Sequence, residues 1–270
     1  MKKLNLKTQC ACIVDGTAWI FSNEYNALFH WQLDSEDIDF VCSFENESLL
    51  SPSLFTRMIP YGKKLFLVPC VAKSLAHDLV IYDMPSGAVQ YLPMVYGEKA
   101  VNYNATVKGS KAILFPVVYS RYAYLLDMEK EELNCVKLDF GKYNDTFQNV
   151  IGPLFCGNAW LGETLLYGVY GTENILKVNS KNYGIEIETR DGLNSSLYLL
   201  STHNSSLYGL DVQGSKLICF SSADEERIFN LPFREKRDVF QNGNKMAYPQ
   251  NFPLKDGSFL MIPAKGNDLL

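Results

Sequence analysis

Six turns of similar composition each precede a short run of mostly apolar residues, such as KLFLVP or KAILFP. Five of the turns contain Gly, and the sixth contains Asn, which tolerates a positive φ better than most residues. No ten-residue window carries a clean apolar stripe at helical spacing, so the runs predict short β-strands in hairpins. The turns are Asp15-Gly16, Tyr61-Gly62, Lys108-Gly109, Leu161-Gly162, His203-Asn204 and Asp256-Gly257.

The spacing of these turns predicts a repeat architecture. They recur every 42 to 53 residues, which is the period of four-stranded propeller blades. Each unit continues with a second apolar segment and, after an acidic or Gly-containing turn, a third one. The sequence therefore predicts an all-β fold, a six-bladed β-propeller of four-stranded antiparallel blades, formed by a single domain over residues 1–270.

One hairpin repeats itself within the stretch NSSLYLLSTHNSSLYGL, residues 194–210. A turn at His203-Asn204 places Leu200 opposite Leu207, so that each strand matches its partner. Asn204 then replaces the Gly that is present in the other turns.

The two ends of the chain predict how the ring of blades closes. Only 13 residues follow Gly257, so the sixth unit lacks its fourth strand. Residues 3–7 (KLNLK) precede the first strand of the first unit, which we place at residues 10–14. We expect this N-terminal segment to pair as the outer strand of the C-terminal blade, because closure removes exposed sheet edges.

Charge and composition narrow the classes of partner. The net charge is −5 and no run of Lys or Arg exceeds a pair, which argues against nucleic acid. No stretch approaches the apolar length of a membrane helix, and the N-terminal residues lack the apolar region of a signal peptide. The seven cysteines are scattered without a Cys-x-x-Cys motif, as expected for buried free thiols in a reducing compartment. We therefore expect a cytoplasmic protein that binds neither membrane nor nucleic acid.

Three segments of the second unit resemble a known repeat. They are GKKLFLVP (62–69), DLVIYD (78–83) and GAVQYLP (87–93). Together they are similar to a kelch-type propeller repeat, in which a strand ends in Tyr-Asp before a turn and a short outer strand. Kelch-like propellers are mostly binding platforms, with a minority of enzymes, so the resemblance implies a binding protein.

The two faces of such a propeller differ in this sequence. Connections between the first and second and between the third and fourth strands of each unit are short and acidic. The remaining connections are long and rich in Tyr, Phe, Asn and Arg, and long loops are commonly functional. Tyr and Asn suit a sugar or an extended peptide, although aromatic residues also pack between blades. The candidate binding residues are Tyr25, Tyr103, Tyr119, Arg121, Tyr143, Tyr170 and Tyr248.

Catalytic motifs are harder to find. Of the three histidines, only His77 falls in a long loop, and no nucleophile elbow, phosphate loop or metal-ligand cluster is present in the sequence. Asp83 and Asp127 end their third strands at matching positions, which indicates bonds to turn amides. The sequence favours a non-catalytic protein without cofactor or metal that binds a glycan or a peptide segment of a partner. The alternative is a carbohydrate-active enzyme, a hydrolase or lyase, whose residues converge on the central channel from different blades.

Overall fold

The computed structural model divides the chain into two compact units, Met1–Lys137 and Leu138–Leu270. We describe each unit by itself, and the prediction of one domain over residues 1–270 stays a prediction. The structure describes residues 8–32, 37–70, 78–94, 101–150, 154–170, 172, 174–189, 197–203, 206–211, 216–220, 226–230, 250–253 and 259–262.

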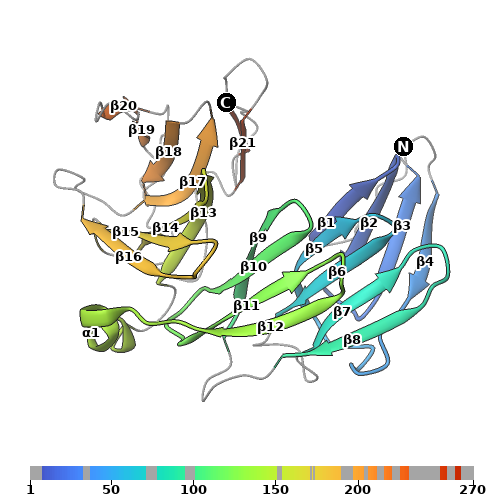
Figure 1. Cartoon of the computed structure of the whole chain (residues 1–270). Helices are drawn as coiled ribbons and strands as arrows, with labels where there is room; N and C mark the ends of the chain where they lie inside the picture. The colour runs from blue at the N-terminus through green and yellow to red at the C-terminus, as the bar shows by residue number, and fades with distance from the viewer. Residues whose placement is uncertain are drawn as a thin grey trace. The chain divides into compact units, whose positions relative to one another are not determined.

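The first unit contains three four-stranded sheets, which we call blades 1 to 3 (Figure 1). In each blade every strand pairs antiparallel with the next strand along the chain. The strands are β1 (Thr8–Val14), β2 (Thr17–Ser22), β3 (Leu28–Gln32), β4 (Ile38–Cys42), β5 (Phe55–Tyr61), β6 (Lys64–Pro69), β7 (Asp78–Asp83), β8 (Val89–Pro93), β9 (Tyr103–Lys108), β10 (Lys111–Pro116), β11 (Tyr122–Asp127) and β12 (Glu132–Lys137).

The second unit contains two further four-stranded sheets, blades 4 and 5, and a two-stranded sheet, blade 6. A short helical segment, a 3-10 turn followed by one short α-helix, lies in the connection after β12. The elements are η1 (Gly141–Tyr143), α1 (Asn144–Gln148), β13 (Phe155–Leu161), β14 (Thr164–Val169), β15 (Asn174–Asn179), β16 (Ile185–Thr189), β17 (Leu197–His203), β18 (Ser206–Asp211), β19 (Lys216–Phe220), β20 (Glu226–Asn230), β21 (Gln250–Pro253) and β22 (Phe259–Ile262). The prediction of an all-β fold built from four-stranded antiparallel blades is confirmed.

Left-handed turn residues close the first hairpin of blades 1 to 4. In blade 1 both loop residues are left-handed, with φ of 48° at Asp15 and 79° at Gly16. In blades 2 to 4 only the first loop residue is left-handed, and it is Gly62, Gly109 or Gly162, with φ of 57°, 62° and 59°. Both patterns belong to the hairpin turns whose twist matches that of the flanking strands.

The predicted register of the hairpin in blade 5 is wrong by one turn position. Leu200 pairs with Gly209 and His203 with Ser206, so the two loop residues are 204 and 205. The prediction assigned Asn204 to the second loop position, and it placed Gly62, Gly109 and Gly162 there too. Gly16 of blade 1 is second, as predicted, whereas the glycines of blades 2 to 4 come first in their loops. Because the partner shifts by two residues, every side chain keeps its predicted face of the sheet.

Blade 2 is buried on both faces, which explains the nearly unbroken apolar run of β6. Leu65 and Leu67 belong to an apolar cluster with Phe21 and Leu28 of blade 1. The alternate residue Phe66 belongs to a second cluster with residues of blade 3. A strand in the middle of such layers reads as continuous hydrophobicity rather than alternation.

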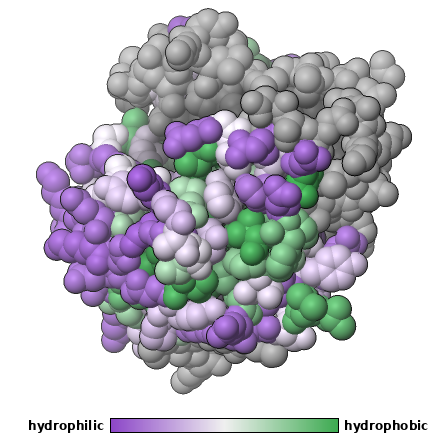
Figure 2. Space-filling model, turned by 90° about the vertical axis from the view of Figure 1, so that its right-hand side faces the viewer, coloured by the Kyte–Doolittle hydropathy of each residue, from purple (hydrophilic) through white to green (hydrophobic). Residues whose placement is uncertain are grey.

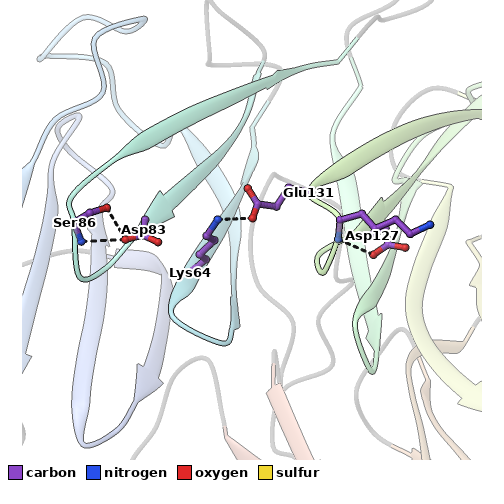
Figure 3. Close-up of polar contacts among 6 residues, drawn as sticks. Lys64, Asp83, Ser86, Asp127 and Glu131 are labelled. Atoms are coloured by element: carbon purple, nitrogen blue, oxygen red, sulfur yellow. Dashed lines mark hydrogen bonds and ion pairs between the residues drawn. The ribbon is translucent and has the colours of Figure 1, made fainter.

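The turn between the third and fourth strands has the same construction in blades 2 to 4. Asp83 Oδ1 accepts hydrogen bonds from the amide and hydroxyl of Ser86 at 3.0 and 2.6 Å, and Asp127 Oδ1 accepts one from the Lys130 amide at 3.1 Å (Figure 3). Asn179 Oδ1 accepts two turn amides in the same way. The hydrogen bonds from Ser86 lower the pKa of Asp83. The prediction that Asp83 and Asp127 bond to turn amides is confirmed.

Ring closure falls outside the described residues. Residues 3–7, which we expect to pair with the last blade, and residues 267–270, which we expect to begin its third strand, are not among those described. Closure by the N-terminal strand therefore stays a prediction.

Candidate functional site

In blade 1, a single buried asparagine holds the β2–β3 loop against the connection from β4 to β5. The side chain of Asn26 is 1% exposed. Its Nδ2 donates hydrogen bonds to the carbonyl oxygens of Phe44 at 2.7 Å and Glu47 at 3.1 Å, and its Oδ1 accepts one from the Phe44 amide at 3.0 Å. Both donor protons and the carbonyl of Asn26 are thus used within the fold, so its role is structural.

Further hydrogen bonds fix the rest of this loop. Ser22 Oγ accepts the amides of Glu24 and Tyr25 at 3.1 and 3.2 Å. The hydroxyl of Ser53, a residue with φ of 56°, donates to Asn23 Oδ1 at 2.5 Å. These Asn and Ser side chains therefore hold the shape of the loop.

Three apolar side chains lie exposed on this hydrogen-bonded support, and we call them the loop patch. They are Tyr25, Leu49 and Leu50, with exposed fractions of 48%, 59% and 72%. The amide of Asn26 donates to the carbonyl of Leu49 at 2.9 Å, which places Leu49 beside the Tyr25 end of the loop. Contiguous exposed apolar patches, unlike single exposed apolar side chains, mark interaction surfaces.

A second pair of predicted residues meets in the β10–β11 loop of blade 3. Arg121 Nε donates a hydrogen bond to Tyr119 Oη at 3.1 Å. Tyr119 is half-buried and Arg121 is exposed. The Tyr122 amide donates to Ser120 Oγ at 3.2 Å, which shapes the loop between them. Together the phenol and the guanidinium offer a flat ring and a fixed positive charge.

Tyr103 lies beneath this loop rather than on its surface. It is 2% exposed and packs edge-to-face on Tyr124, with ring centroids 5.2 Å apart. Burial raises the pKa of Tyr103 and raises the pKa of Tyr124 to about 12, while a side-chain hydrogen bond with Ser120 acts on Tyr103 in the opposite direction. Tyr103 is thus a packing residue of the cluster between blades 2 and 3, and it supports the loop that carries Tyr119 and Arg121.

The remaining predicted residues belong to the second unit. Tyr143 ends η1 and stacks on Phe147, with ring centroids 5.6 Å apart. Lys142 Nζ lies 5.2 Å from the centroid of the Tyr143 ring. Tyr170 follows β14 directly, and its amide donates to the Leu154 carbonyl at 2.8 Å. Tyr248 lies outside the described residues.

Blade 1 carries another exposed apolar surface, on the sheet face opposite to blade 2. Figure 2 views the molecule from the side on which β4 lies in Figure 1 and shows apolar atoms gathered among hydrophilic ones. Phe40 of β4 and Ile13 of β1 are exposed, and Phe40 meets Phe29 edge-to-face at 5.9 Å. An apolar sheet face of this kind suits packing against another layer more than recognition of a small ligand.

The candidate catalytic side chains of blade 1 are a histidine beside an aspartate and three thiols of raised pKa. His30 sits in β3, with Nε2 3.2 Å from Asp39 Oδ2 on the paired strand, while His77 lies outside the described residues. Burial raises the pKa of the Cys10 thiol and brings those of Cys12 and Cys42 to about 11, which keeps them protonated and poorly nucleophilic.

Two further classes of site are missing from the described residues. Within those residues, no group of three or more His, Cys, Asp or Glu is arranged to hold a metal ion. The same part of the chain contains no helix with the length and apolar character needed to span a membrane.

Solved structures with a similar fold include both enzymes and binding proteins. Virginiamycin B lyase from Staphylococcus aureus, in a selenomethionine form, matches 98% of this chain over 88% of its own, with 11% identity and a TM-score of 0.62. A catalytically inactive variant of that lyase with quinupristin matches 87% of this chain over 73% of its own, with 12% identity and a TM-score of 0.61. A structure from a nidogen–laminin complex matches 84% of this chain over 81% of its own, with 12% identity and a TM-score of 0.51.

These similarities establish that the chain has a β-propeller fold, without singling out the kelch type. No family model and no curated protein sequence matches the chain. At 10–12% identity, the likeness extends to the fold and leaves the function to be argued from the residues.

Proposed function

We propose that this chain is a non-catalytic binding protein. Its long-loop face, formed by the connections between the second and third strands of each blade and between successive blades, contacts a glycan or a peptide segment of a partner. The observation that carries the proposal is the presence of partly exposed aromatic and exposed cationic side chains on loops that internal hydrogen bonds already fix. Arg121 and Tyr119 provide the clearest case. A surface ordered before binding loses less conformational entropy when a ligand arrives, which favours recognition.

The chemistry of the same loops supports binding over catalysis. The side chains of Ser22 and Asn26 hold backbone groups of the β2–β3 loop and of the β4–β5 connection, and Asn23 Oδ1 accepts the Ser53 hydroxyl. Tyr119 and Arg121 supply stacking area and charge-assisted donors, which suit sugar hydroxyls, carboxylates and peptide carbonyls. The kelch-type resemblance, as a further part of this proposal, favours a binding platform.

An enzymatic function is the second candidate, because two of the similar structures are lyases. Under this alternative the chain is a carbohydrate-active hydrolase or lyase. It predicts that a polysaccharide is shortened on incubation with the protein, whereas binding predicts that the polysaccharide is retained unchanged. Product analysis of the same incubation separates the two.

Binding of the unsubstituted protein and of substituted variants to glycan and peptide arrays tests the proposal. Tyr119→Ala and Arg121→Ala should each weaken capture of the best array ligand by about tenfold or more, as expected for a central contact. Arg121→Lys should restore only part of the loss, because lysine keeps the charge but not the planar fork. Tyr183→Ala, in a turn of blade 4, is the matched control and should bind as the unsubstituted protein does. Equal binding by all variants would refute this placement of the site.

A further inference from the structure

Two cationic side chains lie at the long-loop end of blade 3. Arg121 directly precedes β11, and Lys137 ends β12 in register with Tyr122, so both belong to the same end of the β11–β12 hairpin. Arg121 and Lys137 are exposed, and Tyr122, which follows one in the chain and faces the other across the sheet, is 36% exposed. Together with Tyr119, these residues form what we call the basic end of blade 3.

The carboxylates of this blade lie at the other end of the hairpin. Residues 101–137 contain four of them, all in or beside the β11–β12 turn: Asp127, Glu129, Glu131 and Glu132. Strand β11 runs from Tyr122 to Asp127, which is about 17 Å at the rise of a β-strand. Charges are largely screened beyond the Debye length of about 8 Å at physiological salt. Because residues 95–100 contain one Glu and one Lys and so add no net charge, the basic end favours an anionic ligand.

The main chain of this loop is already used, which favours a glycan over an extended peptide. The Val117 amide donates to the Asn102 carbonyl at 2.8 Å, and the Tyr122 amide donates to Ser120 Oγ at 3.2 Å. Strand β11 pairs with β10 on one side and with β12 on the other. Peptides that bind as added strands depend on main-chain hydrogen bonds, whereas sugars are recognised through side-chain donors and aromatic rings.

The guanidinium of Arg121 is oriented by its neighbour in the loop. Its Nε donates to Tyr119 Oη at 3.1 Å, which uses one of the five N–H donors of an arginine. Guanidinium groups form strong, charge-assisted hydrogen bonds with acidic oxygens. Contact with a ligand requires only that an acidic group reach the exposed part of this side chain.

We infer that the basic end of blade 3 binds an acidic glycan, a polysaccharide whose sugar units carry carboxylate or sulfate groups. The acidic groups pair with Arg121 and Lys137, and the sugar rings contact Tyr119 and Tyr122. This inference rests on the proposed binding function and makes it specific, since it names the ligand class and adds Tyr122 and Lys137 to the site.

Binding of the full chain to three immobilised polysaccharides tests the inference. Polygalacturonate carries carboxylates, dextran sulfate carries sulfates and dextran is uncharged, so we expect binding to at least one of the first two and none to dextran. Lys137→Gln should weaken this binding about two- to fivefold, the range expected for an exposed ion pair, and should make it less dependent on salt. Lys130→Gln, the matched control, removes the same charge from the turn at the other end of the hairpin and should leave binding unchanged. Thermal unfolding verifies that both variants are folded.

The outcomes separate this inference from the proposed function. Unchanged binding by Lys137→Gln, equal losses in the two variants, or equally tight binding of dextran would overturn the acidic glycan. If a neutral glycan or a peptide binds instead and depends on Arg121, the proposed function stands and this inference is wrong. If neither the acidic polysaccharides nor the arrays yield a ligand, both proposals fail.

Discussion

Replacement of Asn26 by alanine should destabilise the first unit strongly, because one side chain satisfies two buried backbone groups of Phe44 and the partly buried carbonyl of Glu47. Substitution removes two bonds to the carbonyls of Phe44 and Glu47 and one from the Phe44 amide. Each lost hydrogen bond costs about 1 kcal/mol, and a buried group left without a partner costs about 1–3 kcal/mol. Because water can reach some of these groups after the change, we expect a total of about 3–4 kcal/mol.

Unfolding by urea and by heat measures this effect. A loss of that size is a large part of the about 5–15 kcal/mol that stabilises an ordinary domain, and it corresponds to a decrease in Tm of about 10 °C for a chain of this length. Asn46→Ala is the matched control. Asn46 is exposed and donates one side-chain bond, to Asp78, so its loss should cost less than about 1 kcal/mol.

The reasoning would be refuted if the two alanine variants unfolded alike. It would also be refuted if Asn26→Ala unfolded normally but lost its loop structure, since the hydrogen bonds would then shape the loop without contributing to stability. Amide hydrogen exchange at Phe44 distinguishes these results, because the Asn26 side chain is the partner of that amide.

Three other predictions concern the core and the turn face, which carries the connections between the first and second and between the third and fourth strands of each blade. Tyr183 has φ of 58° at the position where blade 2 has Gly87, so Tyr183→Gly should stabilise by about 0.5 kcal/mol and Gly87→Ala should destabilise by about 1–2 kcal/mol in urea unfolding. Lys64 of blade 2 forms an ion pair with Glu131 of blade 3 (Figure 3), and a double-mutant cycle should give a coupling of about 0.5–1 kcal/mol that decreases in high salt. Burial raises the pKa of Cys12 from 9.0 to about 11, so the folded state holds this proton more tightly than the unfolded state. The free energy of unfolding should therefore fall as pH rises from 9.0 to about 11, and Cys12→Ser should make this fall smaller in urea unfolding.

The repeat of blades could be predicted because its signal lies in backbone conformation. Turn positions with positive φ admit few residue types, so Gly62, Gly109 and Gly162 mark the hairpins regardless of what surrounds them. The same signal does not say which of the two loop positions the left-handed residue takes. That ambiguity produced the error at residues 203–204 and the same one-position error in the turns predicted at Tyr61-Gly62, Lys108-Gly109 and Leu161-Gly162.

The exposure of individual tyrosines could not be read from loop position alone. Tyr103 begins β9 rather than ending a loop, and it alternates with Ala105 and Val107 on the face that packs on blade 2. This alternation of apolar residues was a signal in the sequence that burial would follow. Tyr25 has no such pattern around it, and it is exposed.

Asn26 and the loop patch were missed because tertiary hydrogen bonds define them. Nothing in the sequence NEYN, residues 23–26, distinguishes an asparagine that binds a ligand from one that holds the carbonyls of a segment 18 to 21 residues further on. Leu49 and Leu50 resemble core residues by composition, and only the path of the β4–β5 connection reveals that they face outward.

The two faces of the blades differ in how much their side chains contribute to the links between connections. On the turn face, a backbone bond links the two turns of a blade in the same way in blades 2 to 4. Met84 donates to the Lys63 carbonyl, Met128 to that of Ser110 and Ser180 to that of Glu163, at 2.8 to 3.0 Å. Side-chain identity matters little there, because the link uses main-chain atoms.

On the long-loop face a backbone bond also recurs in blades 2 to 4, from the amides of Cys70, Val117 and Tyr170 to the carbonyls of Leu54, Asn102 and Leu154, at 2.6 to 2.8 Å. Side-chain contacts that differ from blade to blade add to it. Blade 1 uses Asn26 and Ser53, whereas blade 3 supports its loop with Tyr103 and Ser120. A change of sequence on this face therefore changes the local shape without disturbing the repeat, because the strand pairing and the turn face are held separately. A fold with this division can acquire a particular ligand on one face while the other maintains the architecture, so recognition by this chain is expected where its blades are least alike.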